Sequence, residues 1–211
     1  RFFFAMNCES KFVAIFDDDT VPGLKFFENC LEHFECHPGI YGTRGLRFLS
    51  RNRYAPYHQY GWMEPNERLM EVDIVGHNWF LKTEWLPAFT RNLTLADKDN
   101  LAGEDIHLSF ALQAELGIKT YVPPHPSGEQ DLWGSIPELA NRYGQDSSAI
   151  SSSKSALSRF DKEVDKVCKN GFSLFYERSN EMNVNNIKIA SLSRSTTLKR
   201  IIGKSPRIRR L

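Results

Sequence analysis

The sequence has few cysteines and no long apolar run, and each shortage excludes a class of protein. Its four cysteines, Cys8, Cys30, Cys36 and Cys168, show no C-x-x-C spacing, so they predict neither a zinc knuckle nor a dithiol redox motif. Reduced structural thiols are expected. No stretch of about 18 apolar residues occurs, so we expect no transmembrane helix. No signal peptide is visible, and the chain opens at Arg1 without an initiator methionine, which indicates a fragment or a processed chain.

An excess of one charge is also lacking. The 27 basic and 26 acidic residues leave a formal charge of +1, so the chain shows no nucleic-acid signature and no such partner is expected. From Arg194 to the end, however, there are seven basic residues and no acid. Such a tail is most often solvated and disordered, and less often it contacts membrane lipids, nucleic acid or another domain. The location in the cell is not fixed by these residues, although a cytoplasmic or membrane-peripheral one is slightly favoured.

What is present is enough apolar material for one α/β domain. Hydrophobic residues make up 41% of the 211 residues, and predicted strands alternate with predicted helices, which is typical of a three-layer α/β domain. A serine-rich stretch at 147–158 marks a boundary. We therefore expect a core at 1–146, a helical or irregular extension at 147–190, and a basic tail at 191–211.

Hydrophobic periodicity and turn residues predict the elements of the core. In chain order, we expect a helix end at 2–6, a strand at 12–16, a helix between 22 and 37, a strand at 40–48, a long functional loop at 50–68, a strand at 72–75, a helix opening at 103–105 and stopping at 117, a strand at 120–122, and beyond the boundary a helix at 160–167.

Three consecutive acids, Asp17, Asp18 and Asp19, follow the apolar strand at 12–16. Ionised carboxylates this close repel one another unless a cation or strong donors balance them. Alternation along an extended chain places Asp17 and Asp19 on one side and Asp18 on the other. Oxygen ligands suit Mg²⁺ or Mn²⁺, which keep positions open for substrate phosphates. The alternative is that Asp19 or Thr20 merely caps the following helix.

A second acidic pair, Glu104-Asp105, opens a later helix. The backbone N–H groups and the helix dipole stabilise acids in a first turn, so a purely structural role is the alternative here. Next to a cation-bound diphosphate, one of these acids would serve as the general base for an attacking hydroxyl. A helix N-terminus lowers the pKa of a carboxylate and weakens it as a base, and burial would counteract this.

Three segments in this order, FVAIFDDDTVPG, VDIVGHNWFLKTEWL and GEDIHLSFALQ, resemble the metal-dependent nucleotide-sugar glycosyltransferases of GT-A fold, family 2-like in type. The resemblance covers about residues 1–144. It implies a Rossmann-like three-layer sandwich with a mostly parallel mixed sheet. Members usually begin with strand–helix units that bind the nucleotide; here only 16 residues precede the acidic triplet, so these N-terminal units are expected to be lacking.

The resemblance also implies a reaction and its residues. A sugar would pass from a nucleotide-diphosphate donor, UDP-linked by expectation, to a hydroxyl of a saccharide or other acceptor, with inversion preferred. Asp17 would lie near the ribose and the metal, Asp19 would ligate Mn²⁺ or Mg²⁺, and Asp18 would support the turn or share the metal. Asp105 would act as the catalytic base, with Glu104 helping to place the acceptor.

Further residues are assigned around this centre. Arg44 is grouped with the nucleotide-binding residues, and His125 falls where some GT-A enzymes have a further metal ligand, although a histidine beside prolines is also a common loop residue. Trp79 and Trp133 are candidates for stacking on sugar rings. Core packing is their alternative role.

Three other functions stay open. A retaining, exostosin-like glycosyltransferase shares a similar triplet and a later acidic pair. The pattern D-x-D-x-[T/V] also resembles haloacid-dehalogenase-like phosphatases, with Asp17 as nucleophile and Asp19 as acid. The last alternative is a non-catalytic protein that binds carbohydrates or nucleotide sugars.

Overall fold

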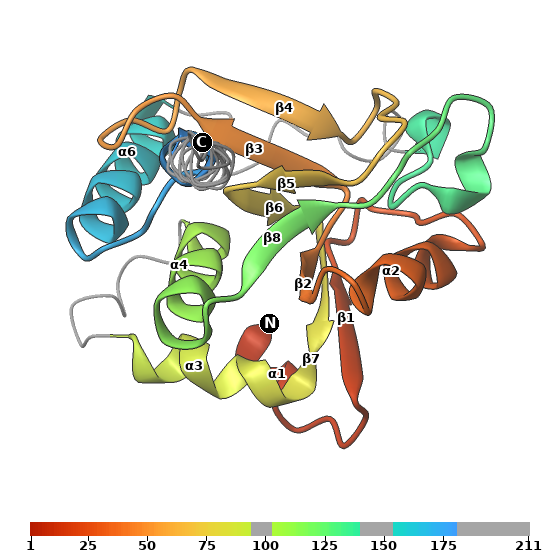
Figure 1. Cartoon of the computed structure of the whole chain (residues 1–211), viewed down its shortest axis with the longest axis horizontal. Coiled ribbons are helices and arrows are strands. Elements are labelled where there is room, and N and C mark those ends of the chain that lie inside the picture. The colour runs from red at the N-terminus through yellow and green to blue at the C-terminus, as the bar shows by residue number, and fades with distance from the viewer. Residues whose placement is uncertain (94–102, 140–153, 181–211) are drawn as a thin grey trace, which may run out of the picture. The chain divides into compact units, whose positions relative to one another are not determined.

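The computed structural model describes residues 1–93, 103–139 and 154–180 (Figure 1). Most of the serine-rich stretch and all of the basic tail lie outside these residues. The elements are α1 (Phe2–Ala5), β1 (Phe12–Phe16), α2 (Phe26–Phe34), β2 (Gly39–Tyr41), β3 (Arg44–Phe48), β4 (Tyr57–Gly61), β5 (Met70–Val72), β6 (Ile74–Gly76), β7 (Asn78–Lys82), η1 (Thr83–Trp85), α3 (Leu86–Arg91), α4 (Glu104–Leu116), β8 (Lys119–Val122), η3 (Gln130–Leu132) and α6 (Lys154–Lys169).

The described strands form two sheets, which confirms a mixed α/β fold. One sheet has five strands in the order β1-β7-β2-β8-β5, and the other has three in the order β4-β3-β6. Among the described strands only β2 and β8 pair in parallel; the remaining pairs are antiparallel. The prediction of a mostly parallel sheet is therefore wrong. Parallel neighbours need long crossovers, whereas the chain from β3 to β7 runs through connections that contain no helix.

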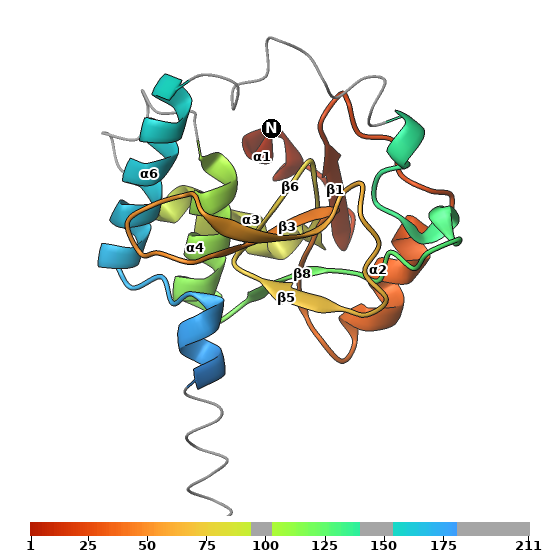
Figure 2. The same ribbon diagram turned by 90° about the horizontal axis from the view of Figure 1, so that it is seen from above.

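Helices cover both faces of the five-stranded sheet. Phe12 of β1 meets Phe34 of α2, with ring centroids 4.9 Å apart, on one face. Trp79 of β7 meets Phe2 of α1, at 5.4 Å, on the other. Figures 1 and 2 show α2 on the opposite side of β1 from α1 and α3. The three-layer arrangement expected from the sequence is therefore present around this sheet.

A second apolar core lies between the three-stranded sheet, α4 and α6. Its fully buried members include Phe48 of β3, Ile74 of β6, Ile106 of α4 and Val164 of α6. Helices α4 and α6 lie side by side (Figure 2). The compact unit Arg1–Phe175 thus includes α6, which lies beyond the boundary predicted at residue 146, while Tyr176–Leu211 form a separate unit.

Two predicted strands each divide between the sheets. The run at 40–48 breaks after β2, where a side chain on Gly42 would collide with the carbonyl of Asn78 at 2.5 Å. The run at 72–75 breaks at Asp73, whose buried carboxylate accepts a hydrogen bond of 2.8 Å from the N–H of Phe48. The predicted loop at 50–68 contains β4. Alternating apolar residues predict strands, but not the point at which a strand passes to another sheet.

One expectation from composition agrees with the structure. The four cysteines are all thiols, as predicted. None of the helices in the described part of the chain is long and apolar enough to cross a membrane.

Candidate active site

The acidic triplet forms a turn directly after β1. The N–H of Thr20 donates to the carbonyl of Asp17 at 3.1 Å, which closes the turn. Asp17 and Asp19 are partly buried while Asp18 is exposed, so the predicted separation of the three side chains is confirmed. Helix α2 begins only at Phe26, and no side chain in the described residues caps it. The alternative role of Asp19 or Thr20 as its cap is therefore wrong.

His77 lies beside this turn, because the pairing of β1 with β7 continues one residue further. The N–H of Asp17 donates to the carbonyl of His77 at 2.9 Å. His77 is the single residue between β6 and β7, where the chain passes from the three-stranded to the five-stranded sheet. It adopts a positive φ of 67°, which is uncommon for a residue with a side chain.

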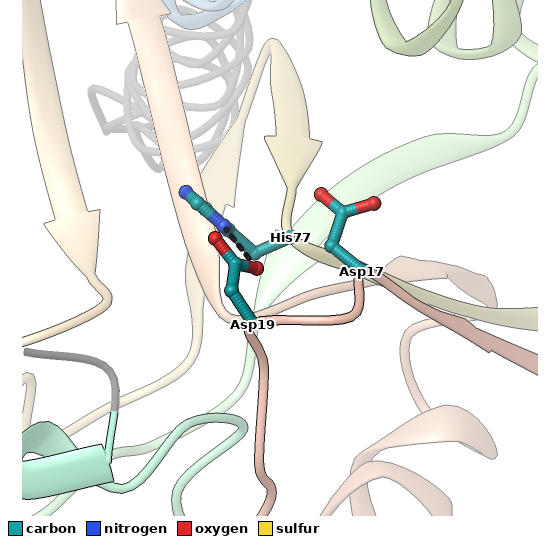
Figure 3. Close-up of side chains that lie close together, drawn as sticks. All are labelled: Asp17, Asp19 and His77. Atoms are coloured by element: carbon teal, nitrogen blue, oxygen red, sulfur yellow. Dashed lines mark ion pairs between the residues drawn. The ribbon is translucent and has the colours of Figure 1, made fainter. Parts of the chain in front are cut away.

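Asp17, Asp19 and His77 form a group that could hold a metal ion. One ligand atom from each lies within 4.8 Å of the others, and all three side chains project to the same side of the turn (Figure 3). The Nδ1 atom of His77 lies 3.7 Å from Oδ1 of Asp19. The predicted acidic cation site thus includes a nitrogen donor that the sequence interpretation did not assign.

Electrostatics suit a cation here. Burial lowers the pKa of His77 to about 4, with Arg44 acting in the same direction and Asp19 opposing, so the ring is neutral at pH 7 as a ligand must be. Burial also raises the pKa of Asp17, and the charges of Asp19 and Glu104 add to this, against Arg1. Crowded carboxylates that resist ionisation are those that a bound cation stabilises.

Arg1 joins the acidic turn to the later acidic pair. Its guanidinium forms ion pairs with the carboxylates of both Asp17 and Glu104. It also lies over the ring of Trp79, 4.6 Å from the centroid. Two motifs far apart in the sequence therefore meet within the reach of one side chain.

Asp105 follows Glu104 in the first turn of α4, and its carboxylate accepts a hydrogen bond of 2.9 Å from the N–H of Ile106. Burial raises the pKa of Asp105 to about 6, and the charge of Glu104 acts in the same direction, while the backbone N–H groups and Arg1 oppose. The effect of burial thus exceeds that of the helix N-terminus. A carboxylate with this pKa suits a general base near neutral pH.

Arg44 lies at the edge of the site, on β3. Its backbone pairs with Gly76, next to His77, and its Nε donates to Oε1 of Gln59 at 2.8 Å. Its charge is one of the causes that lower the pKa of His77. The structure therefore brings Arg44 to the same group as the acidic turn.

Tyr54 lies close enough to both Arg44 and Asp105 for their charges to affect its hydroxyl. Burial, followed by the charge of Asp105, raises the pKa of the Tyr54 hydroxyl, while Arg44 opposes this. The ring stacks on Phe160 of α6 with centroids 4.9 Å apart. Tyr54, like Arg1 and His77, was not assigned from the sequence; its place in an irregular stretch rich in arginine and tyrosine gave no spacing signal.

His125 is not among the three clustered donors. It is fully buried, and its Nε2 accepts a hydrogen bond of 2.8 Å from the N–H of Gly134 while Nδ1 lies 3.1 Å from Oδ1 of Asn66. Both ring nitrogens are therefore engaged, and neither has a lone pair available for a metal. This geometry favours the loop-organising role of His125 over the role of ligand.

The two candidate sugar-stacking tryptophans are packed inside the protein. Trp79 is 3% exposed and Trp133 is 4% exposed. The indole N–H of Trp133 donates to the carbonyl of Pro126 at 2.9 Å, and its ring packs edge-on against His125. Rings this deeply buried offer no face to a sugar, so the structure favours core packing for both.

Comparison with known proteins finds no family: the chain matches no protein-family model, and a search of curated proteins finds no match. The assignment of a function therefore depends on the chemistry of the site.

Proposed function

We propose that this protein is a divalent-metal-dependent glycosyltransferase that moves a sugar from a nucleotide-diphosphate donor, UDP-linked by preference, to a hydroxyl acceptor. The observation that carries the proposal is the contact of Arg1 with both Asp17 and Glu104, which holds a candidate cation site next to a pair of acids. A cation on one side and a base on the other are what transfer from a diphosphate requires.

Asp17 and Asp19 would hold Mn²⁺ or Mg²⁺, and the bound ion would neutralise the charge of the diphosphate leaving group. Asp105 takes the proton from the acceptor hydroxyl while the acceptor oxygen forms a bond with the anomeric carbon of the sugar. The bond from that carbon to the diphosphate oxygen breaks, and the nucleoside diphosphate leaves. Glu104 orients the acceptor. A single displacement of this kind inverts the anomeric configuration.

Two features support Asp105 as the base. Its pKa of about 6 leaves it ionised at neutral pH and still basic enough to accept a proton in the transition state. The carboxylates of its neighbour Glu104 and of Asp17 both form ion pairs with the guanidinium of Arg1, so Asp105 belongs to the helix that faces the acidic turn.

The proposal is tested by nucleotide release. The protein is incubated with Mn²⁺, a panel of UDP-linked and other nucleotide sugars, and saccharide acceptors, and the free nucleoside diphosphate is measured. We expect release with at least one donor, and a loss of at least about 100-fold in Asp105→Asn, because general-base catalysis contributes on this scale. Glu35→Gln is the control, because Glu35 is an exposed carboxylate at the end of α2. UDP binding without consumption of any donor would instead indicate a binding protein.

A further inference from the structure

We propose that His77 is a direct metal ligand and that its nitrogen makes this site prefer Mn²⁺ and later transition metals over Mg²⁺. The inference rests on the proposed function only in requiring a cation at Asp17 and Asp19, and it does not depend on sugar transfer. Three observations support it: the spacing and identity of the three donor atoms, the buried Nδ1 of His77 that has no hydrogen-bond partner among the described residues, and the stacking of its ring on Trp62.

The spacing of the donor atoms fits a shared ion. Two ligands that each lie about 2.1 Å from one ion are at most about 4.2 Å apart. The 3.7 Å between Nδ1 of His77 and Oδ1 of Asp19 is within this limit. The donor atoms of all three residues lie within 4.8 Å of one another, so a small movement of the side chains would bring Asp17 to the same ion as well.

The nitrogen that faces Asp19 has no other use in the structure. Nδ1 of His77 is buried, and among the described residues no group forms a hydrogen bond with it. A buried polar atom without a partner is unfavourable, and a native protein rarely keeps one without a reason. A metal ion would satisfy this lone pair.

The ring is held in place by Trp62. The two rings stack with centroids 3.6 Å apart and planes 19° from parallel. Trp62 is itself fixed, since its backbone N–H donates to the carbonyl of Thr43 at 2.7 Å and the residue is 8% exposed. Histidines that bind metals need a neighbour that orients the ring, and Trp62 takes this role by stacking.

Selectivity follows from the donor set. Carboxylate oxygens alone suit Mg²⁺, Ca²⁺ and Mn²⁺, whereas imidazole favours transition metals, which bind nitrogen more strongly. A site with two carboxylates and one imidazole therefore discriminates against Mg²⁺. Removing the imidazole should remove the discrimination and leave a weaker, purely oxygen site.

The first test is calorimetric titration of the metal-free protein with MnCl₂ and with MgCl₂, in the absence of any donor. We expect Mn²⁺ to bind at least about tenfold more tightly than Mg²⁺. In His77→Asn the affinity for Mn²⁺ should fall about tenfold or more, while that for Mg²⁺ changes by less than about threefold. Asparagine is chosen because it tolerates the positive φ of this position. His58→Asn is the matched control, since His58 is an exposed histidine on β4.

The second test is pulsed electron paramagnetic resonance of the Mn²⁺-loaded protein, which detects nitrogen nuclei bound to the metal. The nitrogen modulation should be present in the wild type and in His58→Asn, and absent in His77→Asn. Mn²⁺ binding without this modulation, or an equal loss of both metals in His77→Asn, would overturn the role of His77 and leave the carboxylate site standing. If the wild type binds neither metal, the cation site of the proposed function fails as well.

Discussion

Asp17 and Glu104 bind the same cation, the guanidinium of Arg1, although one follows a strand and the other begins a helix. In the structure, the guanidinium of Arg1 thus lies between the two acidic groups, where a divalent ion and a diphosphate would bind and add their own charges. A metal at Asp17 must share that carboxylate with Arg1 or displace it, so the two interactions oppose one another.

Arg1→Gln should therefore strengthen metal binding. Removing a positive charge in contact with a ligand carboxylate should raise the affinity for Mn²⁺ about three- to tenfold, measured by calorimetry at low salt. Arg1→Lys keeps the charge and should stay near the wild-type value. If Arg1→Gln binds Mn²⁺ less tightly than the wild type does, Arg1 supports the ion and does not compete with it.

Asp105→Asn should stabilise the protein at neutral pH while it removes activity. Asp105 has a raised pKa in the folded state, about 6 against an ordinary 3.8, so its ionised form destabilises the fold at high pH. The difference corresponds to at most about 3 kcal/mol above pH 6, it is mostly lost by about pH 4, and it disappears below about pH 3, where the carboxyl is protonated in both states. Urea unfolding at pH 4 and pH 7 measures it. An Asn variant less stable than the wild type at pH 7 would contradict this account.

The same carboxyl predicts the acid limb of the pH–rate profile. Because only ionised Asp105 accepts a proton, kcat/KM should be level near neutral pH and should fall about tenfold per pH unit below about pH 6. Saturating Mn²⁺ at each pH keeps metal loss from producing the same fall. A profile that stays level down to pH 4.5 would exclude Asp105 as the base.

His125→Ala should reduce stability without changing metal binding. The substitution leaves the N–H of Gly134 and the side-chain oxygen of Asn66 without their partner inside the protein, which we expect to cost about 2–4 kcal/mol in the free energy of unfolding. His58→Ala, at an exposed position, should change stability by less than about 0.5 kcal/mol. A folded His125→Ala protein with much weaker Mn²⁺ binding would restore His125 as a ligand.

The elements predicted best from the sequence are those whose signals are local. Phe12–Phe16 forms the strand expected from its apolar run, and α4 begins directly after Gly103 and ends before Gly117, both of which adopt positive φ. Whether neighbouring strands pair in parallel or antiparallel could not be predicted from local sequence. Strands alternating with helices favour parallel pairing, but β3 to β7 are joined without helices and pair antiparallel.

The site shows the same division. Asp17 and Asp19 are separated from Asp18 as the sequence predicts, although the reason is the turn that the N–H of Thr20 closes on the carbonyl of Asp17 and not the alternation of an extended strand. His77 reaches the acidic turn only because β7 pairs with β1 in one register, and no spacing within the sequence encodes that pairing. Burial is also a property of the whole fold, and it distinguishes the enclosed Trp79 from an exposed sugar platform.

In the proposed reaction, a divalent ion joins the aspartates of this turn to a diphosphate that faces the acidic pair. Anomalous diffraction from crystals grown with MnCl₂ and UDP tests it most directly. We expect a manganese peak between Asp17 and Asp19, with the diphosphate of UDP bound to it on the side of Glu104 and Asp105. A manganese peak elsewhere, or UDP bound away from these four carboxylates, would exclude this arrangement of ion and diphosphate.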